Sequence, residues 1–174
     1  MGFAGRFVDK LPVNAFLAPL ILQALPEARV VMLRRHPADV VVSSYRQDFA
    51  QAGRMLDYTL SLEATAEHVV RFDHMAKAFA AALPKYRYCE VRYEDLVADL
   101  EGQVRRLLEF CGLGFEAACV RFEENASPVA TASAAQVRQK IYASSVARWK
   151  KYRPWIDVAL RRLVDAGVMS EAEL

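Results

Sequence analysis

The chain has little net charge, few cysteines and no long apolar run, and each shortage excludes a class of protein. Its 174 residues carry 23 basic and 21 acidic side chains, a net charge of +2, so we do not expect it to coat nucleic acid. The cysteines, Cys89, Cys111 and Cys119, lack CxxC spacing and predict free thiols rather than disulfides or a zinc site. The most apolar stretch, FLAPLILQAL, is too short to span a bilayer. With no signal peptide visible, we expect a cytoplasmic protein without a membrane span.

Glycine is scarce where phosphate-binding loops need it. Only Gly2 and Gly5 occur early in the chain, and no GxxxxGK[ST] motif is present, which argues against an ordinary P-loop ATPase or kinase. His68 and His74 are six residues apart and lack HExxH spacing. We therefore expect them to be surface or boundary residues, and we expect no metal site.

Short β-rich segments alternate with helical ones along the chain. The predicted strands are residues 6–9, 29–33 and 86–93. The predicted helices are residues 13–25, 38–49, 57–83, 95–111, 115–123 and 154–166. This alternation predicts a single α/β domain over residues 1–174, with a parallel sheet flanked by helices. Residues 124–147 are small, polar and weakly periodic, and predict a long ordered loop of the kind that is often functional.

Polar side chains follow each predicted strand at its carboxyl end. Lys10 follows the first strand, Arg34 and Arg35 follow the second, and Tyr93 ends the third. Ligands of open parallel sheets bind beyond these strand ends. Cations and an aromatic ring at one edge suit a ligand that contains phosphates and a base.

The segment RVVMLRRHPADVVVSSYRQDF, residues 29–49, holds the most specific pattern. Arg35 stands just before Pro37 at a predicted helix start, where free N–H groups and the helix dipole attract anions, and Ser43 follows eight residues later. A guanidinium and a nearby hydroxyl could clamp a phosphate. The alternative is that Arg35 pairs with Asp39 while Ser43 faces a neighbouring helix.

Other conspicuous residues have plainer expected roles. Trp149 and Tyr152 are expected to pack against the final helix. Glu94 and Asp95 are expected to cap the helix that follows them. His36 is at least as well explained by a solvated turn as by a place beside a cofactor.

Four segments, in order, resemble the PAPS-dependent sulfotransferase family, where PAPS is 3′-phosphoadenosine 5′-phosphosulfate. VDKLPVN is similar to the lysine–proline segment of the protein-sulfotransferase branch, and residues 29–49 resemble the 3′-phosphate-binding segment. VRYEDLVADLEGQVRRLLEFCGL resembles the family's YEDL strand–helix unit. VATASAAQVRQKIYASSVARWKKY resembles the late cofactor loop of the bacterial branch that is often fused to TPR repeats. The resemblance covers about residues 6–153 and implies a P-loop-NTPase-like, three-layer fold.

The resemblance also implies roles for individual residues. Arg35 and Ser43 would hold the 3′-phosphate of PAPS, Tyr93 would contact the adenine, and Lys10 would approach the sulfuryl group as the catalytic cation. The remaining cofactor-binding candidates lie in the late loop: Thr131, Ser133, Arg138, Tyr142 and Ser144. PAPS would be the co-substrate and PAP, adenosine 3′,5′-bisphosphate, the product. The acceptor would be a hydroxyl or amine on a protein, sugar or small molecule.

Plainer interpretations of three of these residues stay open. Lys10 could be a surface lysine, Tyr93 could be a core aromatic with its hydroxyl at the rim, and Arg138 could only brace its loop.

The family's first element has no counterpart in this sequence. That element is a strand followed by a Gly/Ser/Thr-rich loop that cradles the 5′-phosphosulfate, and the catalytic base of related branches lies in or near it. We therefore expect an N-terminally truncated domain with an exposed sheet edge, and no residue is assigned as the base. Sulfuryl transfer from PAPS is one expected function. The alternatives are a non-catalytic remnant that binds PAP or PAPS, or pairs with another chain, and a nucleotide-kinase relative that prefers ATP.

Overall fold

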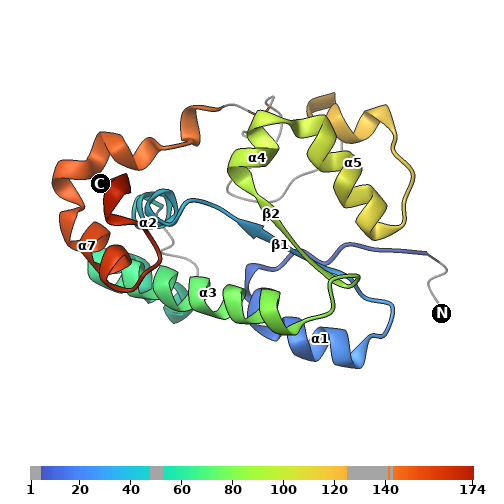
Figure 1. Ribbon diagram of the computed structural model, residues 1–174, viewed down its shortest axis with the longest axis horizontal. Helices are drawn as coiled ribbons and strands as arrows, with labels where there is room; N and C mark the ends of the chain where they lie inside the picture. Colours follow the sequence, from blue (N-terminus) through green and yellow to red (C-terminus); the bar gives the residue numbers. More distant parts are fainter. Residues whose placement is uncertain (1–4, 48–52, 125–140, 142) are drawn as a thin grey trace.

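The computed structural model describes residues 5–47, 53–124, 141 and 143–174. Its described strands are β1 (Val30–Arg34) and β2 (Tyr88–Arg92), which pair in parallel. The register aligns Val30 with Tyr88 and Arg34 with Arg92. Both strands therefore end at the same edge of the sheet, as Figure 1 shows.

Helices surround this small sheet. The described α-helices are α1 (Ala18–Ala24), α2 (Pro37–Tyr45), α3 (Leu62–Ala82), α4 (Tyr93–Ala98), α5 (Leu100–Cys111) and α7 (Asp157–Asp165). The described 3₁₀ helices are η1 (Pro12–Leu17), η2 (Gly53–Leu60), η3 (Ala117–Val120), η4 (Phe122–Glu124), η5 (Ala143–Ser145), η6 (Arg148–Trp155) and η7 (Glu171–Glu173). Figure 1 shows α1 and α3 on one side of the strands and α4 and α5 on the other. The α/β class with a parallel sheet flanked by helices is confirmed.

Local sequence chemistry sets several helix ends. Pro37 occupies the first position of α2, where its missing N–H costs nothing. The Ser61 hydroxyl caps α3, and the Asp99 carboxylate caps α5 by accepting a backbone N–H from the first turn. α5 ends at Gly112, whose φ of 65° is the left-handed conformation that glycine adopts without strain.

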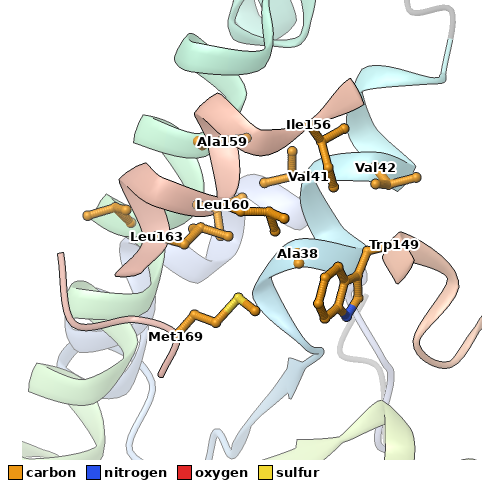
Figure 2. Close-up of a cluster of buried hydrophobic side chains, with 12 residues drawn as sticks. Ala38, Val41, Val42, Trp149, Ile156, Ala159, Leu160, Leu163 and Met169 are labelled. Carbon is orange, nitrogen blue, oxygen red and sulfur yellow. The ribbon is translucent and has the colours of Figure 1, made fainter. Parts of the chain in front are cut away.

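The larger hydrophobic core lies between α2, α3 and α7, with Trp149 of η6 packed into it (Figure 2). Its buried residues are Ala38, Val41, Val42, Ala66, Val69, Val70, Trp149, Ile156, Ala159, Leu160, Leu163 and Met169. Tyr152 packs against this cluster, so the expected packing roles of Trp149 and Tyr152 are confirmed. A smaller cluster of Leu22, Met32 and Tyr88 joins α1 and α3 to the sheet. The C-terminal helices are thus part of the same core as the helix that follows β1.

The predicted strand at residues 6–9 is wrong. Residues 6–11 belong to no helix or strand, and Phe7 and Val8 are 77% and 92% exposed. A β-rich segment forms a strand only when it pairs with another strand. Here the segment is held instead by Arg6, which donates to the backbone carbonyl of Cys111 at the end of α5. Arg29 likewise donates to the carbonyl of Phe110. Two cations therefore satisfy the free carbonyls at the C-terminus of α5.

Several helix boundaries also differ from prediction. The helix expected over 95–111 is two helices, because Asp99 leaves the helical conformation (φ −144°) to cap α5. The helix expected over 57–83 begins at Leu62, after its cap. Residues 115–123 and the start of 154–166 form 3₁₀ turns, the latter around Pro154. Most of the predicted 124–147 loop lies outside the described residues.

One face of the sheet is exposed at β1. Val31 and Leu33 point to this face and are 42% and 57% exposed, whereas Met32 on the other face is buried. No other described strand pairs with β1, which agrees with the expected exposed sheet edge. Among the helices that the structure describes, none is both long and apolar enough to cross a bilayer.

Candidate functional site

Arg35 lies at the carboxyl end of β1, in the turn that leads into α2. Its guanidinium lies over the ring of Tyr93, with 5.0 Å between Cζ and the ring centroid, a cation–π geometry. The same guanidinium donates to the backbone carbonyl of Ser145. Its Nε is buried without a hydrogen-bond partner among the described residues. A half-buried cation with an unused donor therefore lies at the sheet edge where ligands bind in such folds.

Tyr93 reaches this place because it directly follows β2 and begins α4. Parallel strands end at one edge, so the residues that follow β1 and β2 become neighbours. The predicted proximity of Arg35 and Tyr93 is confirmed by their contact. Their roles toward a ligand stay predictions.

The expected alternative, an Arg35–Asp39 pair, is present as an ion pair, although the shorter contacts of Asp39 lie elsewhere. The two side chains approach to 3.8 Å (Nη2 to Oδ2), which is too long for a hydrogen bond. The Asp39 carboxylate is buried, and its Oδ2 and Oδ1 accept the backbone N–H groups of Ala147 (2.8 Å) and Trp149 (2.9 Å). Ala147 has a φ of 53°, which is uncommon for a residue with a Cβ. Asp39 therefore anchors the segment that carries Ser144 and Ser145 to the first turn of α2.

The sequence analysis missed this anchoring role. The available signal was an acidic residue within the apolar run ADVVV, directly after the proline that starts the helix. A carboxylate at such a position is buried only when it is hydrogen-bonded.

The expectation that Glu94 and Asp95 cap α4 is wrong. The N-terminus of α4 has no side-chain cap, and Glu94 Oε1 instead accepts the backbone N–H of His36 at 2.8 Å. Glu94 also lies 3.5 Å from Arg92 Nη2. The turn after β2 is thus tied to the turn after β1. Two carboxylates, Asp39 and Glu94, already face the start of α2, so Arg35 supplies the positive charge that an anion would need there.

His36 is not a solvated turn residue. Its ring stacks on Trp149, with centroids 5.6 Å apart and planes 11° from parallel, and its side chain is 19% exposed. Its Nε2 lies 3.1 Å from Glu173 Oε1. The backbone N–H of Ser170, with a smaller contribution from His36, lowers the pKa of the Glu173 carboxyl. The C-terminal turn η7 is therefore held beside the turn that carries Arg35.

Ser43 is exposed on α2. It lies four residues after Asp39 on α2 and so on the same side of that helix. About 9 Å of helix, at roughly 1.5 Å per residue, separate it from the first residue of α2. The structure places it near the same helix face but outside the contacts that join Arg35, Tyr93 and Ser145.

Lys10 is exposed in the segment that follows Arg6. It makes no ion pair or hydrogen bond with the described residues, although its neighbour Asp9 accepts a hydrogen bond from Asn14 at 3.1 Å. The structure does not bring Lys10 into contact with Arg35 or Tyr93.

Of the late-loop candidates, the structure describes only Ser144. Thr131, Ser133, Arg138 and Tyr142 lie outside the described residues. Ser144 is exposed in η5, and its carbonyl accepts from Arg148 Nε at 3.4 Å. Its neighbour Ser145, which sequence reasoning did not select, is the residue that contacts Arg35.

A cavity of about 320 Å³ lies beside α4. Its lining residues are Val97, Leu100, Val120, Arg121, Phe122, Glu123 and Ile141. Val97 lies one helical turn after Tyr93, on the same side of α4. The cavity is lined by residues of α4, α5, η3 and η4, and Tyr93 is not among them.

Metal-binding side chains and reactive cysteines contribute little at this edge of the sheet. Within the described ranges, no group of three His, Cys, Asp or Glu side chains is arranged to hold a metal ion. All three cysteines are free, as predicted. Burial raises the pKa of the Cys89 thiol, which disfavours the reactive thiolate.

The fold is that of an α/β protein whose two described parallel strands end beside Arg35 and Tyr93. A family model described as the sulfotransferase family matches residues 2–117. The chain belongs to the sulfotransferase family.

Individual relatives agree with this assignment. An uncharacterized protein of Aquifex aeolicus (strain VF5) is 36% identical over 155 residues, which are 87% of this chain and 20% of that protein. The omega-hydroxy-beta-dihydromenaquinone-9 sulfotransferases Stf3 of Mycobacterium bovis and Mycobacterium tuberculosis are 30% identical over 112 residues, 60% of this chain and 28% of theirs. The chain thus spans less than a third of the length of these relatives.

A solved structure shows the same fold. The sulfotransferase domain from the curacin biosynthetic pathway matches with a TM-score of 0.65, covering 93% of this chain and 62% of that one. The sequences are 19% identical, so this likeness concerns the fold alone.

Proposed function

We propose that the protein transfers a sulfuryl group from PAPS to a hydroxyl or amine acceptor. The observation that carries this proposal is the Arg35 guanidinium at the carboxyl edge of the sheet, in contact with Tyr93 and with an unused buried donor. Arg35 would bind the 3′-phosphate, because a planar guanidinium forms strong charge-assisted hydrogen bonds with phosphate oxygens. Ser43 would add a hydroxyl contact from the next turns of α2.

The nucleobase would lie on the α4 side of Arg35. Tyr93 offers an aromatic face there, and the cavity beside Val97 offers apolar walls. The late-loop residues Thr131, Ser133, Arg138, Tyr142 and Ser144 remain proposed cofactor contacts. The Asp39 anchor supports this arrangement, because it holds the end of that loop against α2.

In the proposed reaction, the acceptor oxygen or nitrogen forms a bond to sulfur while the bond between sulfur and the 5′-phosphate oxygen breaks. The electron pair of the broken bond leaves with PAP, and the acceptor loses its proton. Such a displacement depends mainly on positioning and on cations near the leaving phosphate. Lys10 is the proposed cation. The mycobacterial relatives are sulfotransferases of an omega-hydroxy-beta-dihydromenaquinone, whose hydroxyl group favours a hydroxyl acceptor here.

A second candidate function is PAP binding without turnover. It is favoured by the lack of contact between Lys10 and the described site residues.

Reverse transfer from 4-nitrophenyl sulfate to PAP separates the two functions, because each turnover releases coloured 4-nitrophenolate. The proposal predicts PAP-dependent colour, and a loss of roughly 100-fold or more in Lys10→Ala, typical of removing one transition-state donor. Lys85→Ala, which alters a lysine just before β2 at the opposite sheet edge, should keep full activity. PAP binding without colour in the unmodified protein would instead establish the binding-only function.

A further inference from the structure

The 3₁₀ helix η6 concentrates positive charge without compensation. Residues 125–156 contain six Lys or Arg and no Asp or Glu, although the whole chain has a net charge of only +2. Four of these cations lie within the eight residues of η6. We use the term basic surface for Arg46, Lys150, Lys151 and Arg153.

Several other exposed cations are neutralised by neighbouring carboxylates. Arg71, Arg105 and Arg161 form ion pairs of 2.7–2.9 Å with carboxylates one helical turn away. No residue of the basic surface forms an ion pair with a carboxylate in the described ranges. The nearest following acid, Asp157, is already paired with Arg161. An ordinary solvated face would mix both signs, as the other helices do.

The basic surface is separate from the candidate nucleotide site. η6 packs along α2: Trp149 contacts Asp39 near the start of α2, whereas Tyr152 lies under the guanidinium of Arg46 (5.1 Å) just past its end. Asp39 and Arg46 are seven residues apart, about 10 Å of helix at roughly 1.5 Å per residue. The later part of η6 therefore lies at the end of α2 that is remote from Arg35. Figure 1 shows η6 along the outer margin of the molecule.

Exposed apolar side chains follow these cations along the chain. Trp155, the last residue of η6, is 71% exposed, and Val158 in the first turn of α7 is 45% exposed. In contrast, Trp149 points into the core (Figure 2). An exposed indole beside lysines and arginines is the side-chain combination that membrane interfaces select, because the ring lies at headgroup level while the cations meet anionic lipids.

We propose that the basic surface, with Trp155, docks the protein on an anionic lipid bilayer. Arg46, Lys150, Lys151 and Arg153 face the lipid phosphates and carboxylates, and the Trp155 ring enters the headgroup layer. The contact is peripheral and reversible, because none of the described helices could cross a bilayer and each cation adds only a small free energy. The inference rests on charge and exposure in η6 and α7, and does not depend on the proposed sulfuryl transfer.

Vesicle co-sedimentation tests this proposal with the purified protein. Vesicles of phosphatidylcholine mixed with phosphatidylserine should bind the protein, whereas phosphatidylcholine alone should not. Added salt should release it, because exposed charges are screened. Lys151→Gln/Arg153→Gln should lower the partition coefficient about 25-fold, at roughly fivefold per charge, and Trp155→Ala should also lower it.

The control Arg71→Gln/Arg105→Gln removes the same net charge from α3 and α5 and should leave vesicle binding unchanged. PAP binding should survive in every variant. Equal binding to neutral vesicles, or an equal loss in the control, would overturn the proposal. Retention by single-stranded RNA or polyglutamate with no vesicle binding would overturn it too, and would assign the basic surface to a different polyanion or to none.

Discussion

Asp39 accepts backbone N–H groups from residues 108 and 110 positions further along the chain. Its carboxylate is buried, so each oxygen needs a donor to offset the loss of water. Both donors come from the segment that also contacts Arg35 through Ser145. One buried side chain therefore joins the start of α2 to the end of the late loop.

We predict that Asp39→Asn lowers the free energy of unfolding by about 2 kcal/mol, because one acceptor is replaced by an amide NH₂ that faces a backbone donor. Asp39→Ala should cost more, since it leaves both buried N–H groups without a partner. Urea denaturation measures both effects. Asp165→Asn, at an exposed acid at the end of α7, should change the value by less than about 0.5 kcal/mol. An Asn variant as stable as the unmodified protein would contradict the anchoring role.

Sequence reasoning could place Arg35 and Tyr93 together because strand ends in a parallel sheet meet at one edge. It could not place Asp39 or Ser145, because their contacts cross more than a hundred residues and no local pattern encodes them. Glu94 was misassigned for a similar reason. A carboxylate in the first turn of a helix suggests a local cap, whereas the chain uses it to bind His36 across the sheet.

At the scale of elements, η2 and α3 meet through stacked aromatic rings. Tyr58 and His68 lie 3.7 Å apart between centroids with their planes 4° from parallel. Burial, with a smaller effect of the nearby Arg71 charge, lowers the pKa of His68 below its ordinary 6.5. The folded protein therefore keeps this imidazole neutral at pH values where the unfolded chain protonates it.

The lowered pKa of His68 predicts that the folded protein loses stability in mild acid. Below about pH 6.5 the unfolded state binds more protons at His68 than the folded state, so the free energy of unfolding falls as the pH falls. His68→Phe keeps a stacked ring and removes the proton-binding site, so its stability should change less between pH 6.5 and 5. Urea denaturation across this range measures the slope. The Glu67 and Glu173 carboxyls have lowered pKa values, so they affect stability below pH 4.5, outside this window. If the pH dependence of stability is the same in His68→Phe as in the unmodified protein, the prediction is wrong.

Elements with a strong apolar periodicity were predictable from the sequence. Elements that form only by contact with distant segments of the chain were not. α3 and the two paired strands follow from apolar spacing and β-rich composition. Residues 6–9 have the same composition as a strand, but neither of the two described strands pairs with them. The break between α4 and α5 follows from Asp99, whose preference for a cap outweighs the continuous apolar spacing of residues 95–111.

At the scale of the molecule, the C-terminal segment belongs to the main core. η6 and α7 pack on α2 and α3, and Trp149 is 2% exposed within that cluster. Trp155, six residues later, is 71% exposed. The two tryptophans provide a matched comparison of buried and exposed positions.

We predict that Trp149→Ala lowers the free energy of unfolding by about 3–5 kcal/mol, the usual cost of removing a large buried ring. Trp155→Ala should change it by less than about 0.5 kcal/mol. If the alanine variant fails to fold, Trp149→Phe should still fold with a smaller loss. Thermal and urea unfolding report these differences, and equal effects at the two positions would show that Trp149 is not a core residue.

The central claim is that the sheet edge around Arg35 binds the 3′-phosphate of PAPS. Calorimetric titration with PAP and with adenosine 5′-monophosphate, which lacks that phosphate, tests it most directly. We expect PAP to bind at least about tenfold more tightly, because a charged hydrogen bond contributes roughly 1.5–3 kcal/mol. Arg35→Ala should abolish the preference, and Arg105→Ala should retain it. Equal affinities in the unmodified protein, or an undiminished preference in Arg35→Ala, would contradict the account.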